Sequence, residues 1–192
     1  MRHRFLTADV FTDRIFEGNQ LAVLPDGRGL TTVQMQRTAR EFNFSETVFV
    51  LPPESSRHTR RIRIFTPNAE LPFAGHPTIG TAHVLAAIGE ITLERETTDI
   101  VIAEGVGPVS VTVRARDGHP VSARLRAPRP PEFGPPPPPR ADLAAMLSVE
   151  QGYEMGRPSL LEIEAEKRHG AITETGVGGS SVLVSDGLIE IP

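Results

Sequence analysis

The segment from Ile79 to Ile88 constrains the fold more than any other feature of this sequence. It consists of small and apolar residues, it follows Gly75-His76-Pro77-Thr78, and Gly89 ends it. Proline early in a helix and glycine just beyond its end are the residues that helix termini prefer. A helix that is apolar on nearly every side has to be buried. The rest of the chain must therefore surround this segment.

Short strand-like segments lie on both sides of this helix. Their residues alternate between apolar and polar or are rich in β-branched types, and glycine or Asp-Gly turns separate several of them. A second helix is predicted from Thr31 or Thr32 to about Phe42. Many strands around one buried helix indicate an α+β fold with a curled, barrel-like sheet. The predicted strands are Phe5–Val10, Gln20–Leu24, Glu46–Leu51, Arg61–Phe65, Ile100–Ala103, Pro108–Arg114 and Val121–Leu125.

A proline-rich stretch over residues 127–140 divides the chain. It ends in Pro135 to Pro139, which favours extended polyproline geometry and excludes a helix or a central strand. Residues 141–192 that follow are few for an independent domain. The elements predicted there are a helix over Ala141–Leu147 and, between glycine-rich turns, the strands Leu160–Ala165, Ala171–Thr173, Ser181–Val184 and Leu188–Ile191.

Composition excludes several classes of protein. The chain has no cysteine, which rules out disulfides, thiolate metal sites and thiol nucleophiles. No apolar run reaches the roughly 20 residues that span a bilayer, and Met1–Asp9 does not resemble a secretion signal. We therefore expect a cytoplasmic protein with no membrane partner. A net charge of −4 argues against a nucleic-acid partner.

The carboxylate of Glu46 is the first candidate for chemistry. It stands between Ser45 and an apolar strand, and a carboxylate that emerges from a partly dry wall can exchange protons near neutral pH. A surface or helix-capping glutamate is the alternative for such a residue taken alone. Asn19 has a similar ambiguity, because it can orient a polar ligand or simply occupy a turn.

The opening of the apolar helix is the second candidate. The segment Gly75–Thr81 exposes free backbone N–H groups at a helix N-terminus, which attract a carboxylate or a developing oxyanion. His76 at this opening can donate a proton or a hydrogen bond to the same ligand. The alternative is a helix-capping histidine satisfied by backbone groups.

Taken together, several fragments resemble a known family. Their order and spacing are similar to those of the PhzF-like isomerases of phenazine biosynthesis, which have the fold of diaminopimelate epimerase. That fold implies two similar lobes, each a barrel-like sheet around a central helix, with the active site between them. The fragments are Asp9–Asp13, Gly18-Asn19, Ala39–Thr47, Arg63–Pro67, Glu70–Thr78 and Gln151–Ser159.

The resemblance implies an isomerase that needs no metal and no cofactor. Related epimerases use two thiols, whereas the PhzF-like branch uses a glutamate, and Glu46 stands in that motif. It would take a proton from one ring carbon of the small substrate dihydro-hydroxyanthranilate and return it to another. His76 and the backbone of Gly75 would hydrogen-bond the substrate, and Asn19 and Ser45 would help to hold its ring.

The sequence also departs from the family pattern. The second lobe normally contains an Asp-Pro-Ala-Thr-Gly-Ser-Ala segment, which is missing here. Residues 1–126 therefore correspond to a first lobe, 127–140 to a linker and 141–192 to the remnant of an incomplete second lobe. Strands after Gly156 can alternatively return to complete the first lobe. Gln20 replaces a common proline, and we expect this to alter only a turn.

Two functions follow from these observations. The first is a proton-transferring isomerase acting on a small carboxylated ring. The second is a catalytically impaired, internally deleted relative that binds a ligand or associates with itself. Because a lost lobe leaves apolar surface exposed, we expect a homodimer.

Overall fold

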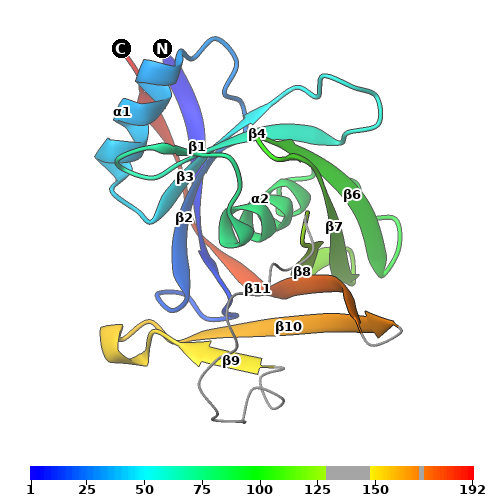
Figure 1. The fold of residues 1–192 in the computed structure, drawn as a ribbon. Coiled ribbons are helices and arrows are strands. Elements are labelled where there is room, and N and C mark those ends of the chain that lie inside the picture. The colour runs from blue at the N-terminus through cyan, green and yellow to red at the C-terminus, as the bar shows by residue number, and fades with distance from the viewer. Residues whose placement is uncertain (129–147, 169–170) are drawn as a thin grey trace.

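A mixed sheet curls around one central helix in the computed structural model, which describes residues 1–128, 148–168 and 171–192 (Figure 1). The helices are α1 (Thr32–Phe42) and α2 (Gly75–Ala87), and a 3-10 turn covers Tyr153–Met155. The strands are β1 (Arg2–Val10), β2 (Asn19–Leu24), β3 (Glu46–Leu51), β4 (Arg60–Phe65), β5 (Glu70–Leu71), β6 (Thr97–Glu104), β7 (Gly107–Arg116), β8 (His119–Arg126), β9 (Ser148–Gln151), β10 (Ser159–Arg168) and β11 (Ala171–Glu190).

The strands close into a ring in the order β1-β2-β3-β4-β6-β7-β8-β11, because β11 also pairs with β1. Helix α2 passes through the middle of this ring and contacts strands on several sides (Figure 1). The predicted α+β class and the sheet wrapped around a central helix are confirmed. Residues 2–126, about two thirds of the chain, supply the ring from β1 to β8.

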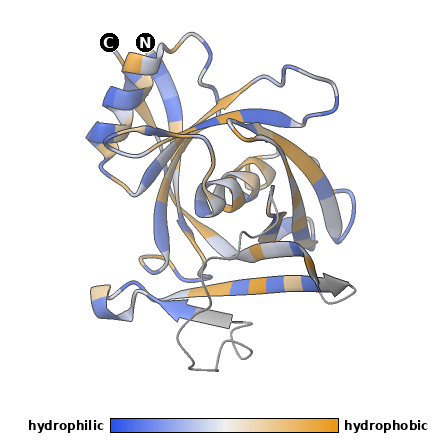
Figure 2. Ribbon diagram, viewed as in Figure 1, coloured by the Kyte–Doolittle hydropathy of each residue, from blue (hydrophilic) through white to orange (hydrophobic). Residues whose placement is uncertain are grey.

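Helix α2 is buried along most of its length, as its apolar sequence predicted. Every residue from Pro77 to Ala86 is buried, and apolar residues of the surrounding strands belong to the same core cluster. Figure 2 shows hydrophobic positions along the strands that surround the helix. Gly80 lies against Leu21 and Val10, where an added Cβ would collide with both side chains. Burial of one such leucine or isoleucine stabilises a fold by about 1.5–3 kcal/mol. The helix is therefore an anchor for the strands that carry the site.

Helix α1 covers the outer face of β3 and β4 and forms a second, smaller core. Met35 and Ala39 on the helix pack with Phe49 of β3 and Phe65 of β4. The neighbours of Phe49 on β3, Val48 and Val50, belong to the core around α2 instead, as strand alternation requires. The helix begins at a capping box in which the Thr31 hydroxyl accepts from the Gln34 backbone N–H. Of the two predicted caps, Thr31 is the one used.

The end of the chain differs from the prediction. Instead of three short strands separated by glycine-rich turns, residues 171–190 form one long strand, β11. Its first half pairs with β8 and β10 and its second half with β1. The glycines serve close contacts rather than turns, because a Cβ at Gly178 would lie 2.9 Å from the Ala123 carbonyl oxygen and one at Gly179 would lie 2.8 Å from the Phe11 ring. Glycine composition alone was therefore a misleading signal.

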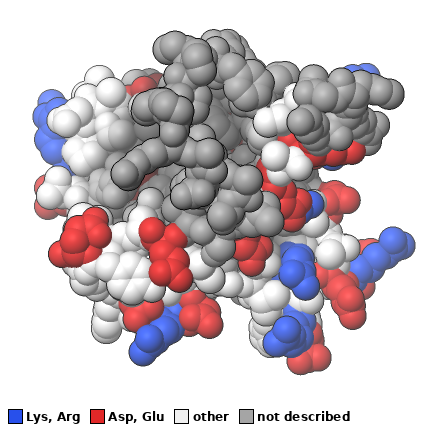
Figure 3. Space-filling model, turned by 60° about the horizontal axis from the view of Figure 1, so that its bottom comes forward, with Lys and Arg blue, Asp and Glu red and all other residues white. Residues whose placement is uncertain are grey.

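Strands β9 and β10 extend the sheet beyond β11 at one side of the ring (Figure 1). Strand β9 was not predicted, and the predicted helix over residues 141–147 lies outside the described residues. On the face that carries these strands, acidic and basic side chains are interspersed, and the described residues show no continuous basic area there (Figure 3). No helix in the described ranges is long and apolar enough to cross a membrane.

Candidate active site

Glu46 and His76, predicted separately, lie next to each other in the structure. Strands β2 and β3 are parallel, with Leu21 opposite Glu46, so both strands begin at the same end of the ring. Helix α2 begins at this end too, and His76 is its second residue. The Nδ1 atom of His76 lies 3.0 Å from Oε2 of Glu46, and the two side chains are 9% and 16% exposed. The fold thus forms a shielded carboxyl–imidazole pair.

The second ring nitrogen of His76, Nε2, contacts the backbone of β2. Nε2 lies 3.3 Å from the backbone oxygen of Gln20, and a carbonyl oxygen only accepts, so Nε2 carries a hydrogen. On the other side of the ring, Nδ1 lies 3.0 Å from Oε2 of Glu46. Among the described residues Glu46 Oε2 is buried without a well-aligned hydrogen bond, so the two groups are in close contact and no aligned hydrogen bond joins them.

His76 lies in the first turn of α2 but is not the residue that caps this helix. The N-cap residue of α2 is Ala74, which makes no side-chain capping bond, so His76 does not cap the helix with its ring. The first-turn N–H groups of Gly75 and His76 have no acceptor within the helix. Phe11, which is buried, lies beside His76 with ring centroids 6.5 Å apart. The site therefore combines a carboxyl, an imidazole and a helix N-terminus against an aromatic wall.

Asn19 and Ser45 occupy neighbouring positions at the same end of the ring. Asn19 is the first residue of β2 and pairs with Val10, and Ser45 is exposed immediately before β3. Asn19 directly precedes Gln20, whose carbonyl oxygen contacts His76, and Ser45 directly precedes Glu46 itself. The substrate-binding roles of Asn19, Ser45 and Gly75 stay predictions.

Glu104, which the sequence reading missed, is a second carboxyl near the start of α2. Its Oε1 accepts a 2.7 Å hydrogen bond from the Thr78 hydroxyl, which also lies 2.8 Å from the Ala74 carbonyl oxygen. Oε2 is buried without a hydrogen-bond partner among the described residues. Burial raises the pKa of Glu104 to about 7, against the opposing bond from Thr78. Glu104 points inward because residues of a strand alternate between its two faces, and Ile100 and Ile102 on the same strand are buried. This alternation is the signal in the sequence that could have identified Glu104.

Asp9 and Arg157 form a third polar group, at the loop that leads into β2. Asp9 is 3% exposed, and burial raises the pKa of its carboxyl although the Phe16 N–H and Arg157 oppose that effect. The Arg157 guanidinium donates to Asp9 Oδ1 at 2.5 Å, to the Glu17 carbonyl oxygen at 2.7 Å and to the Gly18 carbonyl oxygen at 2.9 Å. In the sequence, Arg157 belongs to the family-like segment Gln151–Ser159, but the sequence alone predicted no role for it.

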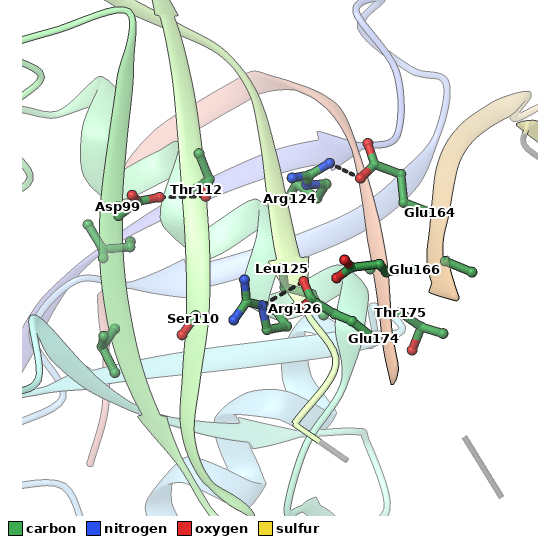
Figure 4. Close-up of a pocket in the computed structure, with 14 residues that line it drawn as sticks. Asp99, Ser110, Thr112, Arg124, Leu125, Arg126, Glu164, Glu166, Glu174 and Thr175 are labelled. Atoms are coloured by element: carbon green, nitrogen blue, oxygen red, sulfur yellow. Dashed lines mark hydrogen bonds and ion pairs between the residues drawn. The ribbon is translucent and has the colours of Figure 1, made fainter. Parts of the chain in front are cut away.

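A hollow of about 570 Å³ lies elsewhere, on the outer face of the sheet (Figure 4). Arg124 on β8 pairs with Glu164 on β10, and Arg126 pairs with Glu174 on β11 at 2.7 Å. These arginines alternate with Leu125, which faces the core, so the hollow opens away from α2. It does not include Glu46 or His76.

Comparisons with known proteins identify the family of this chain. The sequence profile of the family described as phenazine biosynthesis-like protein matches residues 8–148. The chain belongs to this family. An uncharacterized isomerase of Mesorhizobium japonicum is 53% identical over 114 residues, which are 59% of this chain and 37% of that protein. Trans-2,3-dihydro-3-hydroxyanthranilate isomerase of Pseudomonas aeruginosa is 40% identical over 128 residues, 67% of this chain and 44% of that protein.

The matched part of this PhzF-family chain thus spans less than half the length of these curated relatives. Several solved structures share its fold, and two of them serve as examples. A PhzF-family phenazine biosynthesis protein of Bacillus anthracis has a TM-score of 0.81 at 17% identity, with all of both chains covered. A structure described as a predicted epimerase of Pseudomonas aeruginosa has a TM-score of 0.80 at 20% identity, with 99% of this chain and 100% of that chain covered.

Proposed function

We propose that the Glu46–His76 pair of this chain catalyses a cofactor-independent proton transfer that shifts a double bond in a small carboxylated ring. The observation that carries the proposal is the 3.0 Å approach of His76 Nδ1 to Glu46 Oε2 at the start of α2. The relative of Pseudomonas aeruginosa bears the name of an isomerase that acts on trans-2,3-dihydro-3-hydroxyanthranilate. We propose the same substrate, or one of the same chemical class, for this chain.

The reaction needs one base that works twice. The Glu46 carboxylate, next to His76, removes a proton from one ring carbon, and the electron pair of the broken C–H bond shifts the double bonds. The resulting carboxylic acid returns the proton to another ring carbon. No atom is gained or lost, and one carboxyl positioned over the ring serves both steps.

Other groups at this end of the ring would hold the substrate. The N–H groups of Gly75 and His76 at the N-terminus of α2 attract the substrate carboxylate. Asn19 and Ser45 flank the pair and would bond to ring substituents. The proposed transfer uses only side-chain and backbone groups of the chain, and the absence of a metal stays a prediction. Cytoplasmic residence and the absence of a cofactor stay predictions.

Proton exchange tests the proposal directly. The protein is incubated with dihydro-hydroxyanthranilate in deuterated buffer, and isomerisation and label are followed by NMR. Glu46→Gln should lower the rate by about 10²–10⁴-fold, the usual contribution of a general acid–base group. Glu41→Gln, a change at an exposed glutamate five residues away, is the matched control and should keep the full rate. Equal rates in wild type and Glu46→Gln would contradict the proposed role.

A binding protein that associates with itself is the second candidate. Four large apolar side chains outside the ring interior, Phe16, Tyr153, Met155 and Leu160, are 72%, 63%, 69% and 50% exposed. Such surface favours association. Sedimentation equilibrium across a concentration series would test the proposed homodimer. A concentration-dependent mass without isomerisation would favour this second function.

A further inference from the structure

Arg157 connects the C-terminal part of the chain to the site through the backbone of the β2 entry. Its guanidinium binds the carbonyl oxygens of Glu17 and Gly18, and the Gly18 N–H donates to the Pro158 carbonyl oxygen at 2.9 Å. Gly18 is thus held on both its N–H and its C=O by two consecutive residues from the far end of the sequence. Two positions later, the Gln20 carbonyl oxygen accepts from His76.

The path of this loop leaves little freedom for adjustment. Gly18 has φ +64, and a Cβ there would collide with the Val10 carbonyl oxygen, so the loop passes closely over the end of β1. Phe11, whose ring lies beside His76, is held by bonds that do not involve Arg157: its N–H donates to the Ser180 carbonyl oxygen, and its own carbonyl oxygen accepts from the Leu160 N–H. Arg157 therefore acts on the Gln20 side of the imidazole, while Phe11 stays fixed by its own bonds.

We propose that Arg157 is a positioning residue for the Glu46–His76 pair, because it fixes the Glu17–Gln20 backbone so that the Gln20 carbonyl holds the His76 ring in one tautomer. The catalytic consequence rests on the proposed function, whereas the effect on the His76 ring does not. The segment after the linker then takes part in building the site.

The chemistry of this contact requires an arginine. One planar guanidinium donates to three acceptors at once: the Asp9 carboxylate and the carbonyl oxygens of Glu17 and Gly18. A lysine ammonium carries the same charge as a compact point on a flexible stem and lacks the planar fork. Lysine should keep the charge beside buried Asp9 and therefore keep the fold, but it should release at least one carbonyl. This difference makes Arg157→Lys the informative variant.

The test observes the His76 ring without any substrate. In protein with ¹⁵N-labelled histidine, the Nε2 signal of His76 is assigned by comparison with His76→Gln. We expect wild type to show a protonated Nε2 with slow solvent exchange. Arg157→Lys and Arg157→Ala should exchange this hydrogen at least about tenfold faster, because the loss of a hydrogen bond worth about 1.4 kcal/mol changes an equilibrium tenfold. Methylguanidinium added to Arg157→Ala should restore slow exchange.

Arg126→Ala is the control for these variants. Arg126→Ala removes an arginine of the outer hollow, paired with Glu174, and should leave the His76 signal unchanged. If Arg157→Lys is folded and its His76 signal and exchange match wild type, the positioning role is wrong. Isomerisation should fall roughly 10- to 100-fold in the Arg157 variants, since displacement of a reacting group by about 1 Å costs about 10²-fold. A changed His76 signal in a protein that never isomerises would keep this inference and reject the proposed function.

Discussion

Glu104→Gln should make the free energy of unfolding less dependent on pH. The buried carboxyl of Glu104 has a pKa of about 7 in the folded protein, against 4.5 for an ordinary glutamate. The folded state therefore favours the protonated acid. The stability that this group contributes is fully present below pH 4.5 and is lost as the pH rises through about 7. Glutamine keeps the shape and neutrality of the acid but does not titrate.

The size of the effect follows from the shift. At about 1.4 kcal/mol per pH unit, a rise from 4.5 to about 7 corresponds to a loss of about 3 kcal/mol. The charged groups that line the hollow next to Glu104 are Arg61, Arg63 and Glu70. Arg63 is bound to Glu70 at 2.7 Å, and Arg61 pairs with Glu54, so both arginines already have acidic partners.

Urea unfolding between pH 5 and pH 8.5 measures this difference. The stability of Glu104→Gln relative to wild type should increase by about 2.5 kcal/mol over that range. Thr78→Val should move the transition to higher pH, because the hydroxyl donates to the ionised carboxyl and lowers its pKa. Glu94→Gln, at an exposed glutamate ahead of β6, is the control. A difference between Glu104→Gln and wild type that stays constant across the range would refute the reasoning.

Two further substitutions test the local structure. Gly18→Ala should lower the free energy of unfolding in urea by about 2–3 kcal/mol or more, because the residue has φ +64 and its Cβ would meet the Val10 carbonyl oxygen. The control Gly29→Ala, at a glycine with φ +79 but open space around it, should lower it by only about 1–2 kcal/mol. Equal losses in the two variants would argue against the collision. Thr31→Ala removes the capping box of α1 and should cost about 1 kcal/mol, while Val33→Ala on the exposed face should change stability little; no loss in Thr31→Ala would show that the cap is dispensable.

The sequence was sufficient to predict the centre of the fold. An apolar segment opened by Gly75-His76-Pro77 required burial, and seven short strand patterns were enough to imply a sheet wrapped around it. These are local signals of periodicity and turn chemistry. The family motifs then pointed to Glu46 and His76, and the structure brings these two side chains together. Their catalytic roles stay predictions until exchange is measured.

The rest depended on contacts between distant residues. Nothing near Gly178 or Gly179 in the sequence shows that Ala123 and Phe11 approach them, so strand β11 was divided at glycines. Likewise, Arg157 is an ordinary arginine until the structure places it beside Asp9, a distance of 148 positions along the chain. The assignment of residues 141–192 as the remnant of a second lobe is a statement about the family and stays a prediction.

The closure of the ring by β1 and β11 has a consequence for how the chain acquires its structure. These strands pair residues 2–10 with residues 181–190, so the last seam joins segments separated by almost the whole chain. Contacts of such long range form slowly, because a large loop must close before they stabilise anything. During synthesis, one edge of β1 and one edge of β8 stay unpaired until β11 leaves the ribosome. Over that interval the nascent chain is most exposed to aggregation, and β11 ends this exposure by covering both edges at once.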